Sequence, residues 1–159
     1  TVVVLGYLLY EQMAQLKENA VSIITSVFVG CITGVLSVIF IARYFGADHA
    51  LVASLEPKSV TTPIAMSIAE RSGGIPAIAA GGVIVVGIFG GLVGPFILER
   101  LGIKSRIARG LALGSAAHGL GTAKAMELGA VEGAISGLAI GVMGIMTAIL
   151  VPVIELFIG

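Results

Sequence analysis

Three long stretches without a charged residue constrain the fold of this chain more than any other feature. They are Asn19–Ala42, Ser72–Leu98 and Gly133–Ile154. Each exceeds the roughly 20 apolar residues that a helix needs to cross a bilayer. Only 11% of all residues are charged, against about 25% in soluble domains. The sequence therefore predicts an all-α integral membrane protein, a multi-helix bundle with one transmembrane domain over residues 1–159.

Three shorter uncharged stretches predict interrupted helices. They are Thr1–Tyr10, Ser59–Ala69 and Gly110–Ala123, each too short or too broken to be a simple span. We expect two or three of these stretches to form broken or re-entrant helices inside the bundle. A separate pattern, glycines four residues apart, predicts close packing between helices. These glycine sets are Gly30/Gly34, Gly87/Gly91, Gly90/Gly94 and Gly133/Gly137/Gly141.

The first complete interruption, Glu56–Met66, is polar. It contains two prolines with Lys58, Ser59, Thr61 and Thr62. Pro63 removes a backbone donor and disfavours helical geometry at the preceding residue. Irregular backbone at membrane depth survives only where protein or a water-filled cavity satisfies the freed groups. We therefore predict a binding site here, between a short helix in Ala47–Leu55 and a helix that resumes over Ile64–Arg71.

A second interruption is predicted around two glycines, Gly119 and Gly121, with His118 beside them and Lys124 one turn further on. A phosphate-binding loop would need lysine where Leu120 stands, so nucleotide binding is excluded. With zero net charge and no basic tract, nucleic acid is not an expected partner. Neither a nucleophile–base pair nor a ligand cluster for a metal is visible, so we expect neither enzymatic activity nor a cofactor.

Broken segments that alternate with intact spans point to a transporter's substrate site. A weak internal repeat, Phe28–Thr33 against Val142–Thr147, supports this interpretation. The repeat is inverted if Ala50–Ser72 dips into the membrane and returns, and parallel if that segment crosses; we favour the inverted form. The positive-inside rule places the basic stretch Arg100–Arg109 in the cytoplasm with either arrangement.

The candidate binding residues each have a structural alternative. Lys58 is a candidate anion partner or a residue whose charge reaches the membrane interface. Ser59, Thr61 and Thr62 precede a helix whose free amides and dipole attract a carboxylate, or they cap that helix.

The second interruption supplies its own candidates. His118 is a candidate proton carrier or a neutral, hydrogen-bonded residue at the break. Lys124 is an anion partner or pairs with Glu127 three residues on, and Thr122 adds a hydroxyl to the candidate set.

Four sequence blocks resemble the LrgB/CidB family and stand in the family's order. They are Pro57–Met66, Gly73–Ala77, Ile107–Ala112 and His118–Ala123. The resemblance implies a multi-pass protein of the bacterial inner membrane, of which this chain is the C-terminal two-thirds. The family often has Tyr-Pro-Leu-Tyr where this chain has Tyr7-Leu-Leu-Tyr10, which puts a break there in doubt.

The resemblance implies two different functions. Bacterial members are named antiholin-like or holin-like and modulate murein hydrolases and autolysis, which implies a small holin-like partner protein in the membrane. Related members resemble carriers of small monocarboxylates, including a plastid glycolate/glycerate translocator. Paired breaks with hydroxyls and lysine suit a carrier better than a holin. We therefore predict a homo-oligomeric transporter of the pyruvate, glycolate or glycerate class, with autolysis regulation as the alternative.

Overall fold

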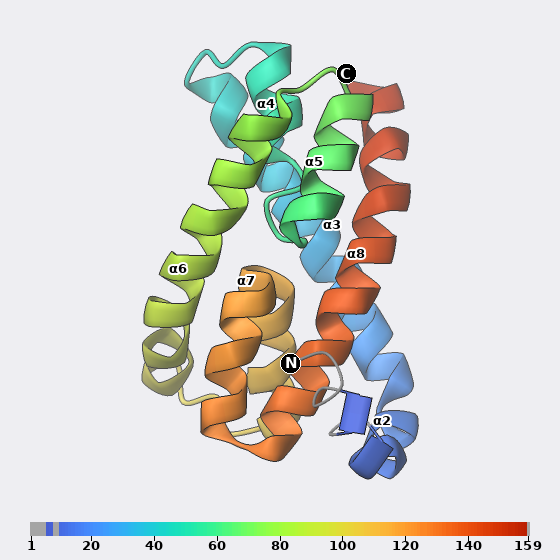
Figure 1. Ribbon diagram of the computed structural model, residues 1–159, viewed down its shortest axis with the longest axis vertical. Helices are drawn as coiled ribbons and strands as arrows, with labels where there is room; N and C mark the ends of the chain where they lie inside the picture. The colour runs from blue at the N-terminus through green and yellow to red at the C-terminus, as the bar shows by residue number, and fades with distance from the viewer. Residues whose placement is uncertain (1–5, 8–9, 159) are drawn as a thin grey trace.

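The computed structural model describes residues 6–7 and 10–158, which form helices and no strand (Figure 1). The helices are α2 (Met13–Glu18), α3 (Ala20–Tyr44), α4 (His49–Leu55), α5 (Thr62–Arg71), α6 (Pro76–Arg100), α7 (Arg106–Leu128) and α8 (Ala130–Ile158). The all-α prediction is confirmed. The predicted interruption in Thr1–Tyr10 falls mostly outside the described residues.

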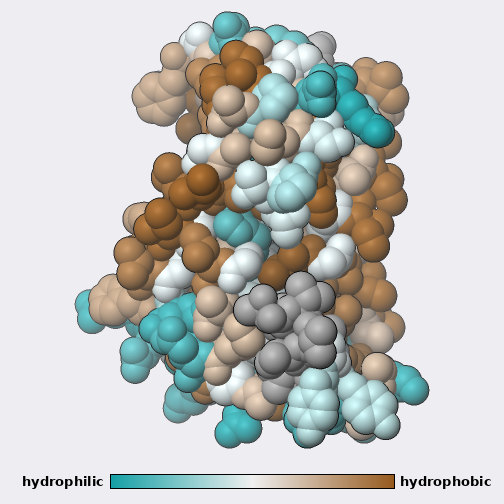
Figure 2. Space-filling model, viewed as in Figure 1, coloured by the Kyte–Doolittle hydropathy of each residue, from teal (hydrophilic) through white to brown (hydrophobic). Residues whose placement is uncertain are grey.

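The three predicted spans are α3, α6 and α8, with 25, 25 and 29 residues. At 1.5 Å per residue each is long enough to cross a hydrocarbon core of about 30 Å. Their outward faces expose large apolar side chains, including Val29, Phe40, Val85, Leu92 and Ile149. Figure 2 shows hydrophobic flanks between two ends that carry most of the hydrophilic residues. The protein is a multi-pass membrane protein.

Local sequence signals set several helix ends. Asp48 and Ser105 cap α4 and α7, because each side chain accepts a hydrogen bond from the backbone amide three residues on. Gly46, Gly73 and Gly102 follow α3, α5 and α6 with φ between 69° and 78°. Glycine adopts this left-handed conformation without the steric penalty of a side chain.

The α4–α5 segment is a re-entrant hairpin. The two helices contain 7 and 10 residues, so they reach only about 10 and 15 Å along their axes. The ring Nε2 of His49, at the start of α4, lies 3.0 Å from the carbonyl oxygen of Ser72, just after α5. The chain therefore enters the bundle and returns to the same end (Figure 1), with a turn at residues 56–61.

A second hairpin lies within α7. The backbone is non-helical at Ala117 and His118, and a Cβ placed on Gly121 would meet the carbonyl group of Leu113. The second arm therefore folds back along the first. The break lies just before the predicted position between Gly119 and Gly121. The residue with the unusual backbone conformation is His118, with φ 41°, which the sequence analysis placed beside the break.

The two hairpins enter from opposite ends and their tips face each other in the middle of the bundle (Figure 1). Because both hairpins return, α3, α6 and α8 are the helices that cross within the described part of the chain, and α3 and α8 run in the same direction. The match between Phe28–Thr33 and Val142–Thr147 therefore lies on parallel helices, and the favoured inverted form is wrong for this match. The elements of opposite orientation are the two hairpins, which enter the bundle from opposite ends.

The hairpin geometry also settles how the basic residues are divided between the ends. Lys17 lies at the same end as the Arg100–Arg109 stretch, whereas Arg43 and Arg71 lie at the other end. The positive-inside rule therefore predicts that the second hairpin enters from the cytoplasm and the first from the opposite side.

Small residues let α7 pack closely against its neighbours. A Cβ on Gly90 would lie 2.5 Å from the Cβ of Ala117, and one on Gly94 would lie 2.8 Å from Leu113. These contacts confirm the packing role predicted for this glycine set. On α3, every fourth residue is buried, and this stripe includes Val27, Cys31 and Val35.

Candidate functional site

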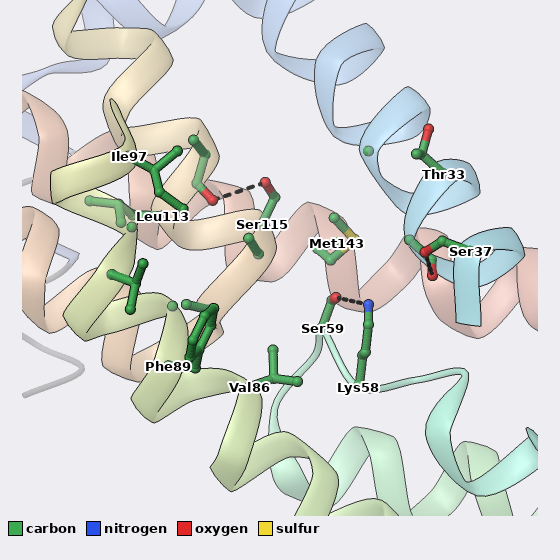
Figure 3. Close-up of a pocket in the computed structure, with 18 of the residues that line it drawn as sticks. Thr33, Ser37, Lys58, Ser59, Val86, Phe89, Ile97, Leu113, Ser115 and Met143 are labelled. Atoms are coloured by element: carbon green, nitrogen blue, oxygen red, sulfur yellow. Dashed lines mark hydrogen bonds between the residues drawn. The ribbon is translucent and has the colours of Figure 1, made fainter. Parts of the chain in front are cut away.

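A cavity of about 750 Å³ opens between the hairpin tips. Its walls come from α3, α6 and the first arm of α7, and Met143 of α8 closes one side. Apolar side chains such as Val86, Phe89 and Ile97 form most of the lining (Figure 3). A concave, mostly apolar site with a few polar groups is typical of a small-molecule pocket.

Lys58 and Ser59 supply the polar end of this cavity from the tip of the first hairpin. The Lys58 Nζ donates a hydrogen bond to the Ser59 Oγ over 3.3 Å (Figure 3). The ammonium group also lies against α3, 3.7 Å from the position of a Cβ on Gly34. Across the part of the chain that the structure describes, the one ion pair joins Lys124 to Glu127. The Lys58 ammonium group thus has no carboxylate partner there.

Three further hydroxyl groups line the cavity, and the sequence analysis missed them. They belong to Thr33 and Ser37 on α3 and to Ser115 on α7. Ser37 and Ser115 donate to helix carbonyl groups at 2.9 and 2.6 Å, which leaves their oxygens facing the cavity as acceptors. The Thr33 hydroxyl has no hydrogen-bond partner among the described residues, so it is free to donate to a ligand.

The sequence does contain a pattern that indicates the cavity-lining face of α3. Gly30, Thr33, Gly34 and Ser37 recur at the three- and four-residue intervals of one helix face. We predicted that the two glycines pack against a helix. The structure corrects this prediction, because a Cβ on Gly30 would have no neighbour within 4 Å. The small residues make room for the cavity instead.

The remaining candidates of the first hairpin do not line this cavity. Thr61 precedes α5 with extended backbone but makes no side-chain capping bond, and Thr62 begins the helix. The residues that follow, Pro63 and Ile64, line a different hollow. The structure therefore brings Lys58 and Ser59 to the cavity and leaves Thr61 and Thr62 outside its lining.

The candidates of the second hairpin face away from the cavity. His118 is 6% exposed, and its ring Nε2 lies 2.8 Å from the carbonyl oxygen of Val83 on α6. A carbonyl oxygen only accepts, so Nε2 carries a proton and fastens the hairpin tip to α6. Thr122 is buried and bonds through its Oγ1 to the Ser136 Oγ on α8, 2.7 Å away. These contacts favour structural roles for both residues.

Lys124 lies on the outer surface and pairs with Glu127, which is the alternative considered for it. Both line a shallow hollow between α6 and the second arm of α7. The two interruptions therefore share one cavity through Lys58, Ser59 and the stretch 115–117, but not through His118, Thr122 or Lys124. No group of three potential metal ligands occurs among the described residues.

The strained backbone at His118 leads to a testable prediction. A side chain at φ 41° costs about 1–3 kcal/mol, and a hydrogen bond contributes about 0.5–1.5 kcal/mol. His118→Ala keeps the strain and loses the bond, so we expect a lower unfolding temperature in detergent. His118→Gly loses the same bond but relieves the strain, so it should be the more stable variant. Equal stability of the two variants would contradict this account.

Comparisons with known proteins agree on one family. The LrgB-like family matches residues 1–157. The chain is 42% identical to YwbG of Bacillus subtilis, over 91% of this chain and 64% of that protein. It is 39% identical to the antiholin-like protein LrgB of Bacillus cereus, over 95% of this chain and 66% of that protein. The chain thus spans slightly less than two thirds of the length of these relatives. No solved structure matches. This chain belongs to the LrgB-like family.

Proposed function

We propose that this protein carries small monocarboxylates of the pyruvate, glycolate or glycerate class across the membrane, with the acid group bound at Lys58 and Ser59. The main support is the Lys58 ammonium group, which lies inside an apolar bundle without a carboxylate partner among the described residues. A charge at this depth is costly, and such residues typically mark a substrate or ion pathway. An anionic ligand would supply the missing partner.

The polar groups of the cavity suit a single carboxylate. The ammonium group has three N–H donors, of which one is directed to Ser59. Hydrogen bonds between ionised groups are about twice as strong as neutral ones. Because Lys58 is the one cationic side chain in the lining, a second carboxylate would lie unpaired against apolar walls. This argues for monocarboxylates over dicarboxylates.

The placement of the hairpins suits alternating access. One hairpin tip approaches the cavity from each end of the bundle (Figure 1). Substrate sites of secondary transporters typically lie at the midplane where discontinuous helices meet. Displacement of either hairpin would open the same site to a different side.

Uptake measurements test the carrier function. Full-length protein reconstituted in lipid vesicles should take up labelled pyruvate or glycolate in a saturable manner. The vesicles should retain a neutral dye of similar size, because a carrier binds its substrate and does not form an open pore. Dye release that accompanies carboxylate uptake would contradict a carrier.

A second candidate function is regulation of autolysis through a partner in the membrane. The name of the Bacillus cereus relatives, antiholin-like protein LrgB, favours it. This function predicts a stable hetero-oligomer with a small holin-like membrane protein and no saturable carboxylate uptake. Co-purification from membranes, combined with the vesicle assay, distinguishes the two candidates.

A further inference from the structure

Four basic side chains gather where α6 ends and α7 begins. Arg100 is the last residue of α6, Lys104 lies in the connection, and Arg106 and Arg109 lie in the first turn of α7. Arg100, Lys104 and Arg106 are exposed to solvent. One acidic residue, Glu99, accompanies them in this stretch. We call the four basic residues the α6–α7 basic surface.

The backbone of this connection is fixed by hydrogen bonds. The amide of Ile103 donates to the carbonyl oxygen of Leu98 over 2.9 Å, and Gly102 turns the chain with φ 69°. Ser105 then caps α7 by accepting a hydrogen bond from the amide of Ala108 over 3.3 Å. The basic side chains therefore project from defined points of the fold.

The charge of this surface is not neutralised within the protein. None of its four side chains forms an ion pair in the part of the chain that the structure describes. The Arg109 Nε is buried and has no hydrogen-bond partner there, and a buried donor without an acceptor is unfavourable. Arg106 and Arg109 also lie at the positive end of the helix dipole, so their charges do not stabilise α7. These features indicate an anionic ligand from outside the chain.

The acidic residues at the same end of the bundle do not supply this anion. Glu127 pairs with Lys124, and Glu132 is 4% exposed at the start of α8. Glu11 and Glu18 lie next to and within α2, which is on the opposite side of this end from the α6–α7 connection (Figure 1). The basic surface therefore faces outward as a region of net positive charge.

The basic surface lies beside side chains that face the lipid. The 25 residues of α6 extend over about 38 Å, whereas the hydrocarbon core is about 30 Å thick. The end of α6 therefore reaches the headgroup layer. Phe96 and Leu101, on either side of Arg100 in the sequence, are 64% and 69% exposed. The outer surface thus changes from apolar to basic within about one helical turn.

We propose that the α6–α7 basic surface binds the phosphate groups of anionic lipids in the cytoplasmic leaflet. Three of its four side chains are arginines, whose guanidinium groups bind phosphate through two parallel N–H donors. Basic clusters on the cytoplasmic side of a span are typical of anionic-lipid binding. The acyl chains of such a lipid would pack against Phe96 and Leu101, which favours a lipid over free phosphate. This surface does not depend on the proposed carboxylate transport.

A tryptophan reporter tests the proposal, because the chain contains no tryptophan. Leu101→Trp places the reporter beside Arg100 in full-length protein, reconstituted in mixed vesicles of phosphatidylcholine and phosphatidylglycerol. In turn, each lipid carries brominated acyl chains that quench tryptophan fluorescence. Phosphatidylglycerol should be enriched at this reporter by about fivefold or more, the effect of one basic residue near a membrane surface. Ile75→Trp, at the other end of α6, is the control and should report no enrichment.

A pair of double variants in the Leu101→Trp background locates the effect. Lys104→Gln/Arg106→Gln should bring the enrichment close to one, whereas Arg43→Gln/Arg71→Gln removes two charges from the other end and should leave it unchanged. All four side chains are exposed, and circular dichroism checks that both variants are folded.

Three results would overturn the proposal. The first is equal quenching by the two lipids at Leu101→Trp, a measurement that needs no charge to be removed. The second is an enrichment that survives Lys104→Gln/Arg106→Gln. The third is loss of the enrichment when inorganic phosphate replaces chloride at equal ionic strength, because that result would identify a site for free phosphate.

Discussion

Lys58→Met should weaken the apparent affinity for pyruvate or glycolate by about 10- to 100-fold in vesicles that contain the full-length protein. Methionine keeps an unbranched side chain of similar size but removes the charge. Hydrogen bonds to charged groups contribute about 1.5–3 kcal/mol, and each 1.4 kcal/mol corresponds to a tenfold change in affinity. Because Lys58 is the one cationic side chain in the cavity lining, no neighbour there can replace it.

Lys124→Met is the matched control for this substitution. It removes the same charge from a surface ion pair, and exposed pairs contribute about 0–1 kcal/mol. We expect uptake close to that of the wild type. The same uptake assay compares a second pair of variants. Ser59→Ala changes the cavity lining and should weaken uptake, whereas Thr62→Val lies outside the lining and should not. If Lys58→Met and Lys124→Met lost uptake equally at equal protein levels, the cavity would not be part of the transport pathway.

The spans and the first hairpin were predictable because they depend on properties that the sequence states directly. Uncharged length determines which helices cross, and α3, α6 and α8 match the three predicted stretches closely. The turn between α4 and α5 follows from Pro57 and Pro63 with polar residues between them. Backbone that cannot remain helical must turn where protein satisfies it.

The direction in which side chains point was not predictable. Within this short segment, Lys58 and Ser59 face the cavity, whereas Thr61 and Thr62 lie outside its lining. Successive residues of a tight turn point in unrelated directions, so helical periodicity gives no guidance. His118 shows the same limit: its residue type indicates proton chemistry, but its contact with Val83 depends on how α6 packs.

Gly114→Val should reduce the stability of the protein by about 3 kcal/mol or more, the upper range for inserting a side chain into a packed interface. A Cβ at this position would lie 2.7 Å from the Ser136 Oγ and 2.8 Å from the Ser136 Cα. The Cα cannot move without shifting α8, so the side chain would separate the first arm of α7 from the last span. Thermal unfolding in detergent and the yield of folded protein measure this effect.

The control for this prediction is Gly119→Val on the second arm of the same hairpin. Both substitutions place the same β-branched residue in a helix, with the same cost to helix propensity. At Gly119, however, a Cβ would meet nothing within 4 Å, so we expect an unfolding temperature near that of the wild type. The difference between the two variants isolates the contact between α7 and α8. Equal tolerance of valine at both positions would contradict the close packing of the first arm of α7 against α8 at Ser136.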